Sequence, residues 1–293
     1  MKSIFTLTVA LFFCFTALTG QEVPLRTFKD TRVINTHSVE VLQKRKLDIR
    51  IAHRFGDMAG DNGGWANFYG LENAADVMIG GEYGATDNLT IGLYRAAGAA
   101  DLKALINGLM KYKFIQQRDN GSPITLTGMA LGTMSTMKRN PESTGINRFD
   151  KFSHRMAYAV QFMVARRFGD RFSFQLIPSF THRNLVKFED VNDVFSLGAA
   201  TRLQLTKVMA LVADFTLPVN GLQSPFSDAR PDDFEYYPAF GIGMEWDTGG
   251  HVFQFNLTNA EGIMETDYIP NTTTNWFDGE FRIGFTISRM FNL

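Results

Sequence analysis

Hydrophobic and polar residues alternate along most of the chain with the two-residue period of a β-strand. Leu47, Ile49 and Ile51 alternate with Asp48 and Arg50, so this segment has one apolar and one charged face. Beyond the first 20 residues, no segment sustains the 3.6-residue period of an amphipathic helix. The pattern therefore predicts an all-β fold.

Twelve segments show this alternation, although the fifth does so only weakly. Their lengths and spacing match a transmembrane β-strand of about 9–11 residues and its connection. The segments are 47–55, 76–83, 89–94, 110–114, 124–134, 158–164, 172–176, 195–203, 209–217, 240–246, 253–258 and 280–288.

The connections between these segments alternate strictly in length. The short ones are 84–88, 118–122, 168–171, 206–207 and 247–250, and the longer ones are 56–75, 96–104, 136–152, 183–193, 219–235 and 259–276. Short periplasmic turns alternating with longer outer loops are typical of a transmembrane antiparallel up-and-down β-barrel with an even number of strands. A secreted β-sandwich would also alternate, but it predicts no such asymmetry. We therefore expect an outer-membrane barrel of about 12 strands.

Residues 1–20 have the pattern of a signal peptide. Lys2 precedes an apolar stretch from Ile4 to Phe15, and small residues follow before Gln21. The alternative, a membrane anchor, needs about 20 apolar residues, which is longer than this stretch. Cys14 is the only cysteine and lies in this leader, so the mature chain is expected to have no disulfide or reactive thiol.

The segment 21–45 is polar and only partly alternating. We expect a periplasmic N-terminal segment that acts as a latch or a plug, with an additional half-strand as the third alternative. Residues 46–293 are expected to form the barrel, without a second domain.

Two short motifs point to a known family. The first candidate strand ends in His53-Arg54-Phe55-Gly56, and residues 83–89 read Tyr-Gly-Ala-Thr-Asp-Asn-Leu. Over about residues 28–96 the chain resembles a family of bacterial outer-membrane β-barrel proteins known only as a domain of unknown function. The resemblance implies the fold and the outer membrane of a Gram-negative bacterium, but no activity.

The last strand also resembles the signal that the barrel-assembly machinery recognises in such proteins. That signal usually ends in an aromatic residue, whereas here Phe291 is followed by Asn292 and Leu293.

Composition narrows the class of protein further. The 29 basic and 30 acidic residues give a net charge of -1, which offers no electrostatic surface for nucleic acid. A mean hydropathy of -0.10 excludes a protein built from many transmembrane helices. The 27 Phe and 26 Gly suit many strands joined by tight turns.

With the polar faces turned inward, charged residues of both signs line the lumen. The expected lumen-lining residues are Asp48, Arg50, Arg54, Asp76, Glu82, Lys111, Lys113, Arg155, Arg202, Asp214, Glu245, Glu280 and Arg282. This near balance fits either a channel of modest selectivity or a barrel closed internally by ion pairs. Lys111 and Lys113 share one face, where a sugar-acid or phosphate site is an alternative to solvated lumen charges.

Motifs for catalysis and metal binding are absent from the sequence. The five histidines show no metal-ligand spacing, and nucleophile-elbow, phosphate-loop and dinucleotide motifs are missing, so we expect no catalytic residue and no cofactor. His53 is the residue to test for a lipid-modifying enzyme, its alternative place being the head-group interface. Asp57, Asp61 and Asn62 are candidate Ca²⁺ ligands. The acidic residues Asp228, Asp232, Asp233 and Glu235 are further candidates, and solvated loops are the alternative.

The leading hypothesis is a passive channel or uptake component for small polar solutes. A lipid-modifying enzyme and a non-conducting scaffold barrel are the alternatives. Outer-membrane lipid and lipopolysaccharide are the expected surroundings, and no nucleic-acid partner is expected.

Overall fold

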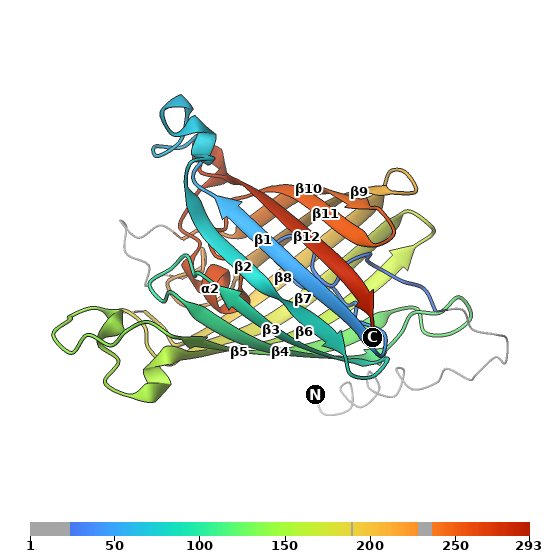
Figure 1. Ribbon diagram of the computed structural model, residues 1–293, viewed down its shortest axis with the longest axis horizontal. Coiled ribbons are helices and arrows are strands. Elements are labelled where there is room, and N and C mark those ends of the chain that lie inside the picture. The colour runs from blue at the N-terminus through green and yellow to red at the C-terminus, as the bar shows by residue number, and fades with distance from the viewer. Residues whose placement is uncertain (1–23, 189, 228–235) are drawn as a thin grey trace, which may run out of the picture.

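The computed structural model describes residues 24–188, 190–227 and 236–293. In these residues, twelve antiparallel strands form one closed barrel in which each strand pairs with its neighbours in sequence (Figure 1). The predicted up-and-down barrel of about 12 strands is therefore confirmed. The leader at 1–20 lies outside the described residues.

The strands are eight to thirteen residues long, as a tilted strand that crosses the membrane requires. They are β1 (Lys46–Phe55), β2 (Ala74–Gly84), β3 (Leu89–Ala96), β4 (Leu105–Ile115), β5 (Thr125–Ser135), β6 (Met156–Phe168), β7 (Phe172–Arg183), β8 (Asp193–Gln204), β9 (Met209–Pro218), β10 (Ala239–Asp247), β11 (His251–Thr258) and β12 (Arg282–Asn292).

The first and last strands close the barrel. β1 pairs with β12 from Lys46↔Asn292 to Arg54↔Gly284, so the sheet has no free edge. Because the lipid core offers no hydrogen bonds to an unpaired backbone, closure is the condition for this sheet to lie in a membrane.

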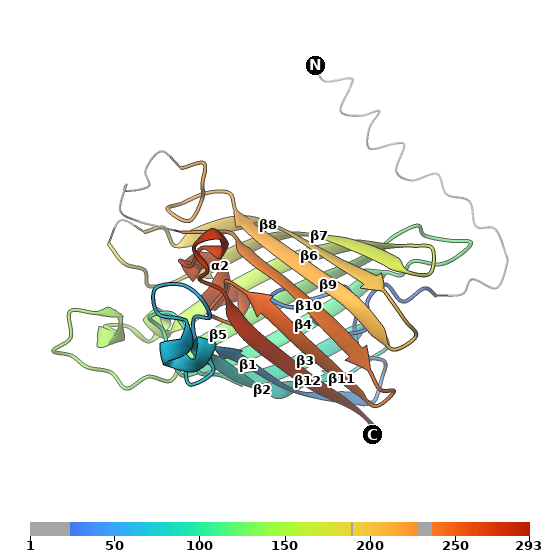
Figure 2. The same ribbon diagram turned by 90° about the horizontal axis from the view of Figure 1, so that it is seen from above.

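The two ends of the barrel differ (Figure 2). One end carries the short turns, the C-terminus at β12 and Pro24, which forms a bridge with Arg118. The other end carries the long loops, which contain the short helices. These are η1 (Trp65–Gly70), η2 (Ile146–Arg148), η3 (Phe152–Arg155), α2 (Glu265–Asn271) and η4 (Trp276–Asp278).

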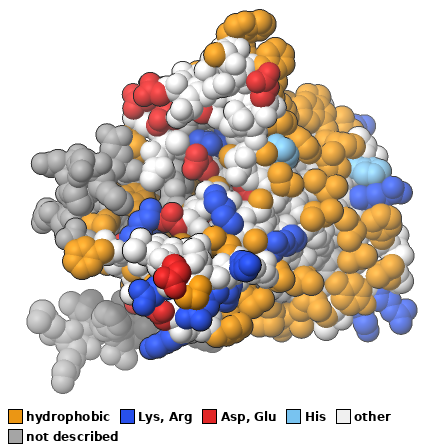
Figure 3. Space-filling model, turned by 60° about the vertical axis from the view of Figure 1, so that its left-hand side comes forward, with side chains coloured by type: hydrophobic (Ala, Val, Ile, Leu, Met, Phe, Trp, Pro, Cys, Tyr) orange, Lys and Arg blue, Asp and Glu red, His pale blue; other side chains and the backbone are white. Residues whose placement is uncertain are grey.

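The outer wall of the barrel is apolar. Ile51, Ile79 and Phe162 point outward and are 41%, 51% and 50% exposed, whereas Arg50 on the opposite face is 1% exposed. Figure 3 shows hydrophobic side chains covering the wall and charged ones gathered at the end that carries the loops. Among the described residues, no helix is long and apolar enough to cross a membrane. The wall itself provides the surface that lipid requires.

The ladder between β6 and β7 has one interruption. Gln161 pairs with Ser179 and Val164 with Leu176, but the two residues between them on each strand are unpaired. Pro178 lies in this gap, and proline has no backbone N–H to donate. The strand nevertheless continues to Arg183, well beyond the apolar alternation at 172–176.

The interior of the barrel is filled by chain from both ends. Residues 24–45, hereafter the plug, lie inside the sheet, where Phe28, Val33 and Val39 pack with Met78 and Met163 of the wall. From the other end, the β11–β12 loop folds inward and buries α2. Of the arrangements considered for the N-terminal segment, the structure shows one inside the lumen.

Candidate functional site: the closed lumen

Most of the residues expected in the lumen are buried on the inner face of the wall. Nine of them are at most 4% exposed: Asp48, Arg50, Arg54, Asp76, Glu82, Lys111, Asp214, Glu245 and Arg282. Lys113 and Arg202 lie on the same face but are half-buried. Arg202 donates from Nε to Oε1 of Glu245 at 2.9 Å, which gives one ion pair within the wall.

Two expected lumen residues lie outside the strands. Arg155 ends η3 and donates to the carbonyls of Ser135 and Met137 at 3.1 and 2.6 Å. Glu280 precedes β12 and accepts from the backbone N–H of Asn275 at 2.7 Å. In both cases the alternation was extended past the strand end, because β6 begins at Met156 and β12 at Arg282. These two residues belong to the outer loops.

Asp214 on β9 binds the middle of the plug. Its Oδ2 accepts the backbone N–H groups of Ile34, Asn35 and Thr36 at 3.1, 2.6 and 2.8 Å. Its Oδ1 accepts Nδ2 of Asn35 at 2.8 Å. Three backbone donors on one carboxylate oxygen fix the chain direction at this point, since each such bond to a charged group is stronger than a neutral one.

Arg50 on β1 binds the plug nearer the periplasmic end. It forms a two-pronged ion pair with Asp30, with Nη1 to Oδ2 at 2.9 Å, and it also contacts Asp48 Oδ2 at 3.0 Å. All three residues are at most 6% exposed. The charge of Arg50 is therefore used within the protein and does not line an open passage.

Other wall residues bind the plug backbone. Lys111 donates from Nζ to the carbonyls of Thr31 and Glu40 at 3.2 and 2.7 Å. Gln175 accepts the N–H of Val39 at 2.7 Å and donates to the carbonyl of His37 at 2.8 Å. Lys111 thus serves two plug carbonyls, and the structure does not join it with Lys113 in an anion site.

Glycine on the inner face gives the plug room. A Cβ at Gly241 of β10 would lie 2.7 Å from Ile34 Cγ2 and 3.0 Å from Asn35 Nδ2. Sequence reasoning identified neither this contact nor any plug residue as part of the site. The available signal was the absence of side chains at inward positions such as Gly241 and Gly243.

The β11–β12 loop closes the outer half of the lumen above the plug. Arg32 of the plug donates to the carbonyl of Ile263 at 2.8 Å and approaches Glu265 Oε1 at 3.5 Å. The N–H of Ile263 donates to Asp76 of β2 at 2.9 Å. Plug and loop are therefore joined to each other as well as to the wall.

Asp267 of α2 holds a neighbouring outer loop. Its two carboxylate oxygens accept the backbone N–H groups of Ala99 and Ala100 at 2.8 and 3.1 Å. Burial, together with the nearby carboxyl of Asp76, raises the pKa of Asp267 to about 7. The contact between these two loops therefore depends on a group that titrates near neutral pH.

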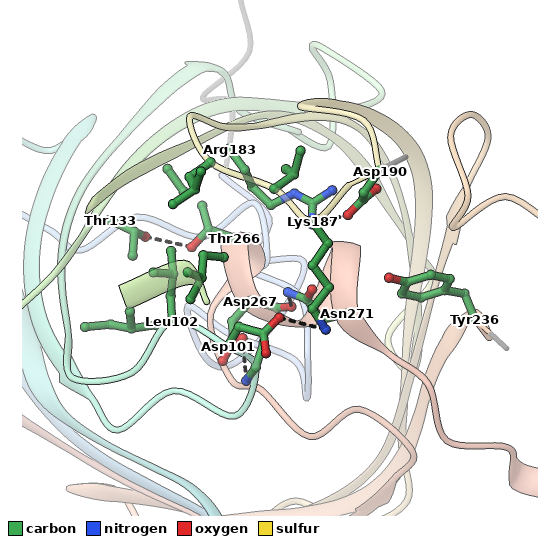
Figure 4. A pocket seen from close by; sticks show the side chains of 16 residues that line it. Asp101, Leu102, Thr133, Arg183, Lys187, Asp190, Tyr236, Thr266, Asp267 and Asn271 are labelled. Atoms are coloured by element: carbon green, nitrogen blue, oxygen red, sulfur yellow. Dashed lines mark hydrogen bonds and ion pairs between the residues drawn. The ribbon is translucent and has the colours of Figure 1, made fainter. Parts of the chain in front are cut away.

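Two hollows remain, one on each side of the closed region. The outer hollow has a volume of about 540 Å³ and lies beside α2, with Thr133, Arg183 and Tyr236 in its lining (Figure 4). A hollow at the periplasmic end, of about 1130 Å³, is lined by plug residues and by Lys113. The lumen is thus open at its two ends and closed between them.

The other candidate sites have ordinary structural surroundings. His53 faces outward, with its ring 4.2 Å from that of Phe55 and 5.6 Å from that of Phe285, and its Nε2 has no hydrogen-bond partner among the described residues. The carboxylate of Asp57 accepts the N–H groups of Gly60 and Asn62 in its own turn. The acidic residues 228–235 lie outside the described residues.

Fold and lumen together define an outer-membrane β-barrel with an internally closed lumen. The chain belongs to the family described as membrane bound beta barrel domain (DUF5777), whose model matches residues 28–291. This family membership and the barrel fold place the protein in the outer membrane of a Gram-negative bacterium. No curated protein matches the sequence.

Two solved structures share the fold. The NanC porin is 10% identical, with 84% of this chain and 100% of that chain covered and a TM-score of 0.51. The COG4313 outer membrane channel from Pseudomonas putida F1 is 12% identical, with 90% and 100% covered and a TM-score of 0.51. At these identities, the comparison shows the fold alone.

Proposed function

We propose that the protein is an outer-membrane channel for small polar solutes, and that the plug holds it closed until a trigger displaces it. The observation that carries this proposal is the pair of hollows at the two ends of the lumen, separated by chain that binds the wall largely through polar groups. The porin and the channel that share this fold support it.

Spontaneous opening is expected to be rare. Each hydrogen bond between plug and wall contributes roughly 0.5–1.5 kcal/mol, or about 1.5–3 kcal/mol where a charged group takes part. The plug makes such bonds to Asp214, Arg50, Lys111 and Gln175. A steadily open passive pore is therefore not the resting state, and displacement needs a bound solute, a partner or an applied force.

The polar character of the wall favours a channel over a scaffold. The groups that bind the plug are carboxylate, guanidinium, ammonium and amide groups, all of which water can satisfy once the plug has moved. A wall built only to be filled would not need buried charges, because apolar side chains of similar volume are often as stable.

Conductance across a planar bilayer tests the proposal. The full chain is expected to give almost no current. A variant without residues 24–45, in which a Gly-Ser linker replaces residues 261–272, is expected to give discrete steps, because both segments that fill the lumen are gone. Folding of each variant is checked by its heat-modifiable migration on a detergent gel.

A matched control keeps the plug and α2 but replaces residues 138–149 of the β5–β6 loop with the same linker. This variant is expected to stay silent. Steady current through the full chain would contradict the closed resting state. A folded but silent double variant would leave the scaffold as the better description.

A further inference from the structure

The outer hollow has the size and the walls of a small-molecule site. Its volume of about 540 Å³ falls within the roughly 300–1,000 Å³ of typical ligand pockets. Thr266, Asp267 and Asn271 of α2 form one side, and Thr133 of β5 and Arg183 of β7 lie opposite (Figure 4). Because α2 is fixed to the wall, the shape of the hollow is set before any solute arrives.

The charged groups around this hollow are already paired. Arg183 contacts Asp190 at 3.0 Å, with side chains only 9% and 5% exposed, and Asp190 also accepts from Gln223 at 2.7 Å. Lys187 contacts Asp101 at 2.9 Å near the mouth. A charged solute would have to displace one of these partners, and leaving a buried charge unpaired is costly.

The groups that remain available are neutral donors and acceptors. Nε of Arg183, a residue 7% exposed, has no hydrogen-bond partner among the described residues. Asn271 uses one amide hydrogen on the carbonyl of Asp267. The hydroxyl groups of Thr133 and Thr266 lie 2.7 Å apart and keep further lone pairs.

The rest of the lining is apolar. Leu102, Leu105, Leu185 and Val186 contribute side chains to the same hollow. A solute that fits both surfaces has hydroxyl groups along its edge and C–H groups on its face. Sugars and cyclic polyols have this arrangement, since every hydroxyl is both donor and acceptor.

We propose that the outer hollow binds a neutral polyhydroxylated solute of the size of a mono- or disaccharide. Binding needs only the outer hollow, so this inference stands whether or not the barrel conducts.

Binding to the full chain in detergent tests the inference. Glucose and sucrose serve as neutral probes, glucuronate and glucosamine as charged relatives of glucose, and saturation-transfer NMR detects each. At least one neutral probe is expected to bind several-fold more tightly than both charged sugars. A preference for glucuronate or glucosamine would overturn the proposal, as would the absence of binding by both neutral probes.

Matched variants assign the binding to this hollow. Asn271→Leu is expected to weaken the binding of the neutral sugar about tenfold, the effect of losing one to two hydrogen bonds. Arg183→Lys keeps the positive charge but removes the Nε donor, and a several-fold loss is expected. Asn140→Leu, the same change on an outer loop away from the hollow, is expected to have no effect. Equal binding by Asn271→Leu and the native chain would contradict the assignment.

Discussion

At the scale of single residues, the lumen is defined by charges that find their partners far away in the sequence. Asp214 accepts the backbone N–H of Asn35, 179 residues earlier, and Arg50 binds Asp30. Alternation predicted that Asp214 and Arg50 face inward, but no local pattern indicates what they bind there. The partners are backbone groups of a segment whose own sequence has no regular period.

Asp214→Asn is expected to loosen the plug without unfolding the barrel. The change removes the negative charge that three backbone N–H groups share, at a cost of about 2 kcal/mol, because bonds to charged acceptors are the stronger ones. Hydrogen–deuterium exchange of the peptide that contains residues 34–36 should then rise roughly 10- to 100-fold.

Glu245→Gln is the matched control, since Glu245 is an equally buried inward carboxylate whose printed bond is to Arg202 of the wall. Exchange at residues 34–36 should not change in this variant. Equal protection in Asp214→Asn and the native chain would show that Asp214 does not hold the plug.

The contact of α2 with the β3–β4 loop is expected to weaken as the pH rises from about 4 to 7. The docked pKa of Asp267, about 7, is above the model value of 3.8, so the docked state binds more protons in this interval. The contact is strongest below pH 4, loses free energy up to pH 7 and is constant above. The full effect is on the order of 4 kcal/mol.

Limited proteolysis of the outer loops at pH 5 and pH 8 measures this effect, with faster cleavage at pH 8 expected. Asp267→Asn keeps an acceptor but cannot ionise, so its cleavage rate, corrected for the protease's own pH dependence, should not vary. A pH dependence that persists in the variant would assign the effect to another group.

At the scale of elements, each strand separates a lipid-facing surface from a polar inner one, and this division could be predicted. The loop rhythm and the strand faces follow from a period of two, which depends on local backbone geometry alone. Strand ends were less accurate, as Arg155 and Glu280 show, because the same alternation continues into loops whose structure is irregular. The plug is the element that sequence left open among three arrangements.

A positive charge in the middle of the outer wall is expected to be costly. Ile79→Arg lies at the centre of β2, where the side chain is 51% exposed on the model surface and faces lipid, and should destabilise the barrel by about 2–4 kcal/mol. Val208→Arg, at a residue 52% exposed in the short β8–β9 turn, should cost only about 0–1 kcal/mol.

Urea titration of both variants in lipid vesicles measures these free energies of unfolding. Equal destabilisation by the two substitutions would contradict the position of the membrane on the barrel.

At the scale of the whole molecule, closure of the sheet and filling of its interior together make one stable unit. The β1–β12 pairing removes the free edge, while the plug and α2 join strands on opposite sides of the lumen. The wall is apolar outside and polar inside, which is the reverse of a soluble domain.

The folded barrel is expected to resist detergent until it is heated. Without heating, the outer-membrane fraction should show a band that migrates faster on a dodecyl sulfate gel than the boiled sample, since the closed sheet stays compact. Identical migration before and after boiling would argue against a closed barrel in the native membrane.

The sequence by itself determined the fold class, the two faces of each strand and the alternation of short and long connections, because these depend on local period and composition. The tertiary structure alone decided that the lumen is closed, which residues close it and where two hollows remain. The physical reason is that the closing contacts join carboxylate, guanidinium and amide groups to backbone atoms as much as 231 residues apart, and such pairs leave no periodic trace in the chain.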